Sequence, residues 1–443
     1  MRGTRGLRTV GGAALGLWLL VSAAGGARAD VQPGMTLDAS TADQAEGLLP
    51  PEILKHYKAG EYVNPVIEFP NDRFKFDDSF NEGTAKNRNT IVLSPDKQPV
   101  DKATGKRPAY LQGLPFPDID EKDPDGGYKI LWNLAYAYYA GGNSHNWTLL
   151  NWISPTGVGR AAGQDVHFLY YDGQPPKYAP AENPDNLLFQ LLAVTASPAD
   201  LQGTAALSYR FKDPNKRDLS WAYVPALRRV RAISPANRSD GFLGSDQSQD
   251  DGFFFDGKPE DFTWRIVGHK EQLRLVDPDS IAGKVRREPL PGGGWRTIAY
   301  NNDRAVGYML KDWKGVAWAP TAAALAKRKF WVIEGVPKDK YYLYGKIELW
   351  IDDTTWQGAW NRKFSWQGEL LNVYQVVGFA TKEFTEGESW WGSTFGYQGS
   401  EAIKQNRATV SGMNGPGGNV ANDRRIPIEP SFFAYQSLNR FGK

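Results

Sequence analysis

The sequence predicts a mainly β protein of the α+β class, in which a large curved antiparallel sheet wraps around a few helices as a half-barrel. Three observations support this fold class. From Asp165 onward, short segments alternate apolar and polar residues, which is typical of half-buried strands. These segments follow one another after short turns with few helical patterns between them, which favours antiparallel pairing over β-α-β units. Aromatic residues make up 13% of the 443 residues, enough to fill a large core.

The first 29 residues have the pattern of a cleaved secretory signal. They combine four arginines, a short apolar run from Ala13 to Ala24, and small residues at Ala27 and Ala29. We therefore expect cleavage after Ala29 and a periplasmic mature protein, with a retained amphipathic anchor as the alternative. The sequence holds no cysteine, which excludes disulfides, thiol catalysis and lipid attachment through an N-terminal cysteine.

The mature chain divides into three parts by composition. Residues 30–128 are rich in Pro and Gly and predict an irregular N-terminal arm packed on the main domain, with a short helix opened by Pro50 and Pro51. Residues 129–400 are expected to form the sheet domain. It begins with an apolar run, Lys129–Tyr139, that fits a helix or a buried strand. Residues 401–443 are expected to form a surface tail with one docked aromatic patch, Phe432–Tyr435.

Within the sheet domain, alternation predicts the strands and two apolar runs predict helices. The two expected helices are Asn186–Ala196, which Pro198 would end, and the Ala-rich Ala317–Lys329. Alternation is clearest in Ala205–Lys212, where Leu207, Tyr209 and Phe211 share one face, and Ser208, Arg210 and Lys212 share the other. The expected strands are Val166–Tyr171, Ala205–Lys212, Leu219–Tyr223, Arg228–Ile233, Phe262–Val267, Lys329–Val336, Tyr341–Asp352 and Glu369–Ala380.

Charge and motifs argue against several classes of function. The formal net charge is +2, and the chain after the four signal arginines is close to neutral, so nothing attracts nucleic acid globally. The four histidines lack zinc-binding spacing, and no nucleophile-elbow or phosphate-loop motif occurs. We expect no cofactor and no metal. Asp246, Asp250 and Asp251 are weak calcium candidates whose spacing departs from an EF-hand, and a solvated acidic loop is the alternative.

The most specific local feature is the segment from Asp218 to Ser234. A strand with Trp221 and Tyr223, a turn, and a return strand with three arginines would set cations beside an aromatic surface. One interpretation is a polar rim that meets an acidic head group or a partner protein. The other is a solvent-facing cationic strand on a buried hairpin. The arginines concerned are Arg228, Arg229 and Arg231.

Three motifs together resemble a proteobacterial family of exported proteins known as a domain of unknown function. They are W-A-Y-V-P-A-L-R-R-V-R from Trp221 to Arg231, G-L-P-F-P from Gly113 with K-I-L-W-N from Lys129, and Y-G-K-I-E-L-W-I-D from Tyr344 to Asp352. That family is similar in fold to the outer-membrane lipoprotein-sorting carriers of the LolA/LolB type. The resemblance implies a curved sheet around helices, an apolar cavity for acyl chains, and partners such as resistance-nodulation-division exporters and outer-membrane proteins. It carries over no catalytic residue.

The sequence therefore predicts a non-enzymatic periplasmic carrier or accessory protein that shields a hydrophobic, lipid-like ligand. The candidate cavity-lining residues are aromatic, and core packing is their alternative role. A second hypothesis is a glycan-binding protein or glycoside-active enzyme, with tryptophan platforms and acid pairs such as Glu348 with Asp352. The lining candidates are Trp221, Tyr223, Trp264, Trp331 and Trp350.

Overall fold

The structure, a computed structural model, describes residues 30–70, 74–234, 238–252, 254–282, 284–298, 306–378, 397–413 and 420–442. The expected signal segment lies outside these residues. A 16-stranded antiparallel sheet dominates the described chain and confirms the predicted fold class. Its continuous path runs β10 (Arg229–Ile233), β9 (Leu219–Val224), β8 (Ala205–Phe211), β7 (Leu187–Ser197), β6 (Gly157–Tyr170), β5 (Ser144–Ser154), β19 (Arg407–Met413), β18 (Gln398–Ala402), β17 (Leu370–Val376), β16 (Gly358–Phe364), β15 (Lys346–Asp352), β14 (Ala324–Pro337) and β11 (Phe262–Val276). Beside β5, β20 (Val420–Arg424) pairs with the hairpin of β12 (Arg286–Pro289) and β13 (Trp295–Ile298).

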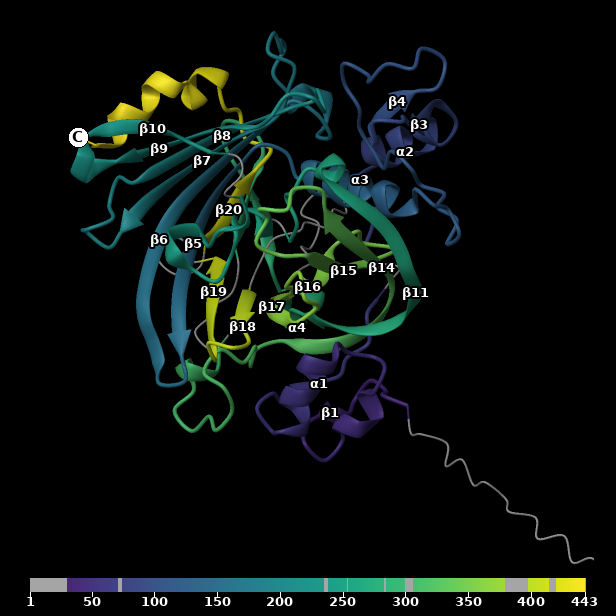
Figure 1. Cartoon of the computed structure of the whole chain (residues 1–443), viewed down its shortest axis with the longest axis vertical. Helices are drawn as coiled ribbons and strands as arrows, with labels where there is room; N and C mark the ends of the chain where they lie inside the picture. The colour runs from purple at the N-terminus through teal and green to yellow at the C-terminus, as the bar shows by residue number, and fades with distance from the viewer. Residues whose placement is uncertain are drawn as a thin grey trace, which may run out of the picture.

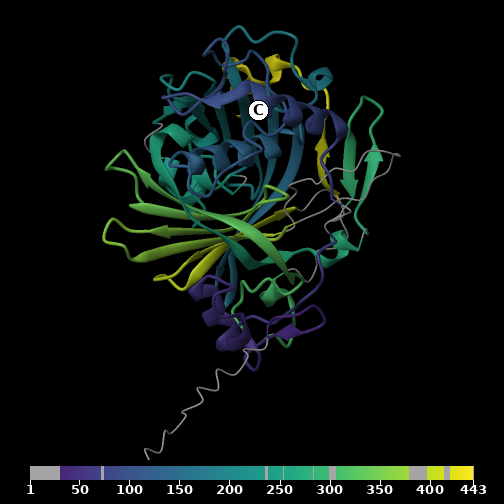
Figure 2. The ribbon, with the colours of Figure 1, turned by 90° about the vertical axis from the view of Figure 1, so that its right-hand side faces the viewer.

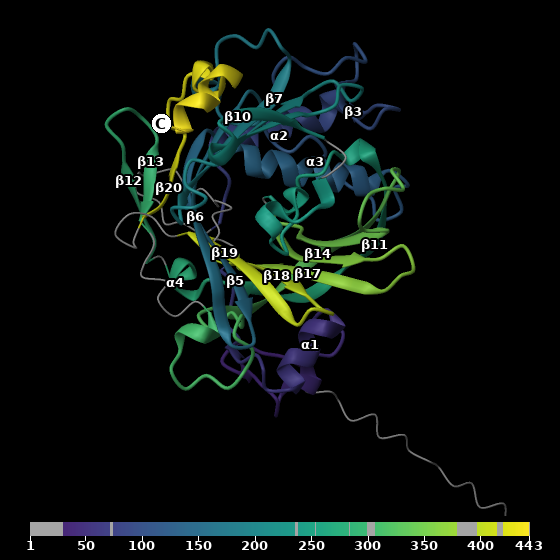
Figure 3. The same ribbon diagram turned by 60° about the vertical axis from the view of Figure 1, so that its left-hand side comes forward.

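The sheet curves around the helix α3 (Gly126–Tyr139), as Figures 1 and 3 show. One core cluster joins α3 to Tyr170 and Phe189 from one wing of the sheet and to Trp264 and Ile333 from the other. Gly127 permits the close approach, since a Cβ there would lie 2.9 Å from that of Trp264. Because α3 is buried on nearly every side, its sequence shows no polar stripe, and periodicity alone left its type open.

The N-terminal segment packs against the sheet at two places. The predicted helix after Pro50 is α1 (Pro51–Lys58), which joins a core cluster with the outer face of β14 to β17. The helix α2 (Asp78–Thr90) and the short β3 (Ile91–Leu93) and β4 (Pro99–Asp101) lie at the other end, near α3. A further short pair joins β1 (Thr36–Leu37) to β2 (Asn64–Pro65). Figure 2 shows the two parts at opposite ends of the molecule.

Both helices predicted inside the sheet domain are wrong. The run Asn186–Ala196 is the strand β7, and residues 324–329 of the run Ala317–Lys329 begin the strand β14. Both strands are covered on two faces: Leu188 and Leu192 of β7 belong to different core clusters, as do Trp331 and Val332 of β14. A strand buried on both faces carries a continuous apolar run, which in sequence resembles a buried helix. Among the described residues after α3, the α-helix is the short α4 (Pro278–Ile281).

The C-terminal residues differ from the expected surface tail. The strand β19 lies inside the sheet between β5 and β18, and β20 also pairs with β5. The expected aromatic patch does dock, because Phe433 is fully buried with Leu438 against the outer face of β7 and β8. Two 3-10 helices, η10 (Pro430–Phe433) and η11 (Tyr435–Gly442), cover that face.

Candidate functional site

A cavity of about 240 Å³ lies on the concave face of β5 to β8. Its wall follows the two-residue period of the strands, since Val166 pairs with Ala193 and Phe168 pairs with Leu191. On β8, Ala206 continues the first of these rows. These side chains all point to one face, so the centre of the cavity wall is apolar.

The segment between β10 and β11 forms the opposite wall. β10 and β11 are the two edges of the sheet path, and of the residues between them, 238–252 and 254–261 are described and lie on the concave side. We call these residues the connecting segment. Polar contacts fasten it to the sheet: Asp246 accepts from Arg407 at 2.9 Å, and Gln247 Nε2 donates to Ser411 Oγ at 3.0 Å. Further along, Asn361 Nδ2 donates to the carbonyl of Phe254 at 3.0 Å.

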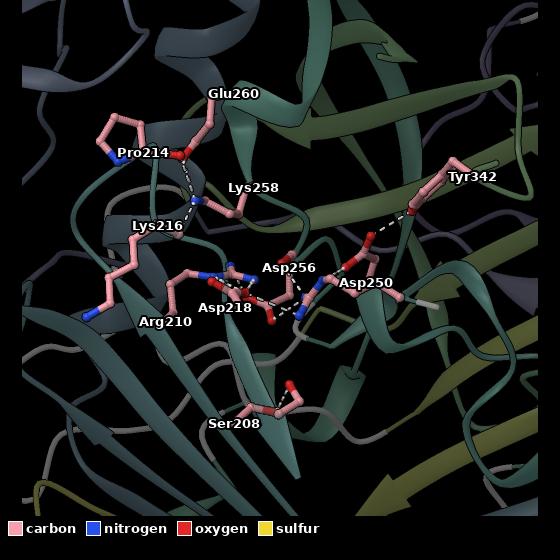
Figure 4. A network of polar contacts seen from close by, with 12 residues as sticks. Ser208, Arg210, Pro214, Lys216, Asp218, Asp250, Asp256, Lys258, Glu260 and Tyr342 are labelled. Atoms are coloured by element: carbon pink, nitrogen blue, oxygen red, sulfur yellow. Dashed lines mark hydrogen bonds and ion pairs between the residues drawn. The ribbon is translucent and has the colours of Figure 1, made fainter. Parts of the chain in front are cut away.

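One end of the cavity is formed by a buried ionic network, shown in Figure 4. Arg210 on β8 donates to Asp218 Oδ2 at 3.0 and 2.8 Å and to Asp256 Oδ1 at 2.9 Å. Arg238 donates to Asp250 Oδ1 at 2.6 Å, to Asp256 Oδ2 at 3.2 Å and to Asp218 Oδ2 at 3.4 Å. The network thus ties β8 and the start of β9 to the connecting segment.

Burial and charge act on the carboxylates of this network in different proportions. Burial pushes the pKa of Asp218 upward, but Arg210 and Arg238 outweigh it and hold that pKa below its ordinary value. Burial dominates at Asp256 and raises its pKa despite the same two arginines. Asp218 is therefore the more firmly ionised carboxylate at this end of the cavity.

The network separates the cavity from a second hollow of about 270 Å³. That hollow is bordered by the β8–β9 turn, the start of β11 and the β14–β15 loop, with Arg217, Lys258 and Tyr342 among its walls. Asp218 and Arg238 line both spaces. The polar end of the cavity is therefore the end that adjoins this outer hollow.

None of the five aromatic candidates lines the 240 Å³ cavity, so their assignment to its wall is wrong. Trp264 is a core residue beneath α3, and Tyr223 lies in the cluster under the C-terminal helices. Trp221 contacts the ring of Tyr435 there, with centroids 5.4 Å apart. The remaining two candidates, Trp331 and Trp350, lie beside the N-terminal segment.

Trp331 and Trp350 pack at separate places near that segment. Trp331 stacks on His269 with centroids 3.7 Å apart. Trp350 donates from Nε1 to Glu348 at 2.8 Å and borders an open groove beside α1. Alternation along a strand shows which residues share a face, but it does not show which face borders the cavity.

The three arginines of the hairpin are exposed and do not reach the cavity wall. Arg229 and Arg231 share a face of β10 with Ile233, which does line the cavity. Arg228 lies in the turn with a left-handed φ of 47°. Their role as a polar rim or partner contact stays a prediction.

The calcium candidates are held by cations and do not converge. Asp246 pairs with Arg407, Asp250 with Arg238, and Asp251 with Lys363 at 2.5 Å. Among the described residues, no group of three or more His, Asp or Glu side chains could hold a metal ion. The alternative of a solvated loop is also wrong for this segment, because Asp250 and Asp251 are buried.

Both acids of the pair in the glycan hypothesis form ion pairs with arginines. Glu348 binds Arg362 at 2.7 Å, and the fully buried Asp352 binds Arg328 at 2.8 Å. Four residues along a strand span roughly 13 Å, which exceeds the separation of about 5–9.5 Å that glycosidases use. This pair does not form a glycosidase site.

The ionic network itself was not predicted. The sequence placed Arg210 on the polar face of its strand but could not show that this face is the concave one. The sequence does show a basic residue within a strand and an acid-rich segment further along the chain. Such a pattern is compatible with buried ion pairs between the two, but it does not specify them.

Comparison with known proteins places the chain among uncharacterised relatives. The model of a protein family described as "Protein of unknown function (DUF1329)" matches residues 36–438. An uncharacterised protein of Pseudomonas aeruginosa is 23% identical over 370 residues, which are 79% of this chain and 70% of that protein.

Two solved structures are similar at lower identity. A putative outer membrane lipoprotein-sorting protein domain from Vibrio parahaemolyticus is 16% identical, with a TM-score of 0.47 over 72% of this chain and 100% of its own. A DUF1329 family protein from Desulfovibrio piger is also 16% identical, with a TM-score of 0.46 and the same coverage.

In the described part of the chain, no helix has the length and hydrophobicity needed to span a membrane.

Proposed function

The chain belongs to the DUF1329 family, whose model spans residues 36–438, and we propose that it is a periplasmic, non-enzymatic carrier of a hydrophobic, lipid-like ligand. The ligand lies in the cavity over β5 to β8, between the sheet and the connecting segment.

The observation that carries this proposal is the apolar centre of the cavity wall. Phe168, Leu191, Ala193 and Val166 present one continuous surface on β6 and β7. An alkyl chain that leaves water for such a surface gains about 25 cal/mol per Å² of buried apolar area, without any chemical step.

The state of the acids at the polar end supports a carrier over an enzyme. Asp218 and Asp256 are bound by arginines. General acid–base catalysis needs a carboxyl group that reaches the substrate and exchanges its proton, and carboxylates engaged by guanidinium groups are poorly suited to this.

A cavity-filling variant tests the proposal. Ala193→Trp adds an indole to the centre of the wall, whereas Ala232→Trp adds the same group at an exposed position on β10. With N-phenyl-1-naphthylamine as a fluorescent apolar probe, we expect binding to weaken at least tenfold in the first variant and to stay unchanged in the second. Ala206→Leu repeats the test with a smaller addition. Equal probe binding by wild type and the folded cavity-filling variants would contradict the proposal.

A further inference from the structure

The cavity has an apolar middle and one strongly charged end, and this distribution of polarity suits an amphiphile. Along β8, Ala206 and Ser208 line the wall, and Arg210 begins the ionic network. Four residues of strand span about 13 Å, so the charged end lies that far from the apolar row of Ala206. The cavity volume of about 240 Å³ lies below the range of about 300–1,000 Å³ typical of drug-sized ligand sites, which favours one alkyl chain over two.

The carboxylate of Asp218 has one oxygen without a partner. Both arginines bind Oδ2, whereas Oδ1 is buried and has no hydrogen-bond partner among the described residues. The residue is 5% exposed and lines the cavity. Because a buried acceptor without a donor is costly, a ligand whose entry shifts Asp218 enough to expose Oδ1 gains stability by donating a hydrogen bond to it.

The charges at this end do not suit an anion. Arg210 and Arg238 face three carboxylates, those of Asp218, Asp250 and Asp256, and each guanidinium already donates to two or more of them. The net charge of this network is therefore negative, and protonation of one carboxylate would make it neutral but not positive.

Other cations near this end are engaged or lie outside the wall. The ammonium of Lys258 binds Glu260 at 3.1 Å and two backbone carbonyls. Arg229 and Arg231 are exposed and do not line the cavity. Arg217 is exposed in the outer hollow and does not line the cavity. An anionic head group held inside the cavity would therefore have to break an existing buried pair to find a cation.

The polar end also faces the route outward. Asp218 and Arg238 line both the cavity and the outer hollow, so a head group at Asp218 would lie at the wall between them. The alkyl chain would extend from there over β8, β7 and β6.

Resting on the proposed function, we infer that the ligand is a single-chain amphiphile with a non-anionic head group that donates a hydrogen bond, an alcohol or an amine, to Asp218 Oδ1. Its chain extends from the ionic network toward the row of Ala206, Ala193 and Val166, and acidic lipids and fatty acids are poor ligands.

The test is a matched panel on the wild-type protein. Dodecanol, dodecylamine and dodecanoate share one chain and differ in head group. Displacement of N-phenyl-1-naphthylamine by each is measured at pH 7.5, below the critical micelle concentration of the two ionic ligands and below the solubility limit of the alcohol. We expect the alcohol and the amine to bind at least tenfold more tightly than the carboxylate. Equal or tighter binding of dodecanoate would overturn the inference and leave the carrier proposal standing. Failure of the probe and of all three ligands to bind would refute the carrier proposal itself.

Asp218→Asn sharpens the test, with Asp200→Asn as an exposed control. The substitution removes the negative charge that the inference uses and keeps the side-chain size. We expect the preference for dodecylamine over dodecanoate to fall at least tenfold in Asp218→Asn and to stay constant in the control. An unchanged preference in folded Asp218→Asn would overturn the inference. Should that variant not fold, the wild-type panel still decides.

Discussion

Arg238 is the cation on which the closure of the cavity depends most, and Arg238→Ala tests that role. The side chain binds Asp218, Asp250 and Asp256 and is 14% exposed, so solvent screens these pairs weakly. Removal of one partner from a buried ionic group leaves uncompensated charge and costs about 3–5 kcal/mol. The substitution should therefore destabilise the whole domain, because it loosens the connecting segment from β8 and β9.

The expected change in melting temperature follows from the size of the domain. Unfolding entropy is about 2.1 cal/mol/K per residue, so roughly 400 residues give about 0.8 kcal/mol/K, and the loss corresponds to a fall of about 4–6 °C. Thermal unfolding followed by circular dichroism measures it. Arg229→Ala, at an exposed position on β10, is the matched control and should change stability by less than about 0.5 kcal/mol. The double variant Arg238→Ala/Asp250→Ala should recover part of the loss, because one unpaired carboxylate is gone. Equal melting temperatures for the two arginine variants would refute the reasoning.

Three further predictions concern other parts of the fold. Burial raises the pKa of Asp277 to about 7, so its contribution to stability is present below pH 4 and is lost as pH rises through 7. In denaturant titrations, Asp277→Asn should lose roughly 2–3 kcal/mol less stability than wild type between pH 5 and 8, and parallel pH profiles would contradict this. Burial lowers the pKa of His56, but Glu401 and Glu61 outweigh burial and raise that pKa. The stability that comes from the ion pair between α1 and β18 is therefore fully present below pH 6.5 and is lost as pH rises through the raised pKa of His56. At pH 6, His56→Gln should cost about 1.5–3 kcal/mol and speed proteolysis within residues 30–70, and unchanged cleavage would count against it. At Gly358 a Cβ would lie 2.0 Å from the Phe254 ring, so Gly358→Ala should cost about 1–3 kcal/mol in chemical unfolding, whereas wild-type stability would show that the ring does not dock there.

Sequence reasoning recognised the alternating strand β8 and misassigned β7, which is apolar on both faces. It did not predict the strands β5, β16, β18, β19 and β20. β8 alternates because its outer face is apolar and its concave face carries Ser208 and Arg210, so its type was evident. β7 is apolar on both faces, because the cavity and α3 cover one side and the C-terminal helices cover the other. A tertiary contact more than 200 residues away thus decided how that segment appears in the sequence.

The position of the cavity could not be predicted for a related reason. Alternation separates the two faces of a strand, but only the curvature of the whole sheet decides which face is concave. Four of the aromatic candidates are buried and Trp221 is half-buried, but none of the five lines the 240 Å³ cavity. The network of Arg210 and Asp218 depends on the path of the connecting segment from one sheet edge to the other, and no local pattern encodes that path.

The most direct test of the carrier proposal is native mass spectrometry of the mature protein purified from periplasm, followed by organic extraction and lipid analysis. The proposal predicts a lipid-like molecule at close to one per chain, retained by Ala232→Trp and absent from Ala193→Trp. A ligand-free wild-type protein that also fails to take up added single-chain lipids would contradict it.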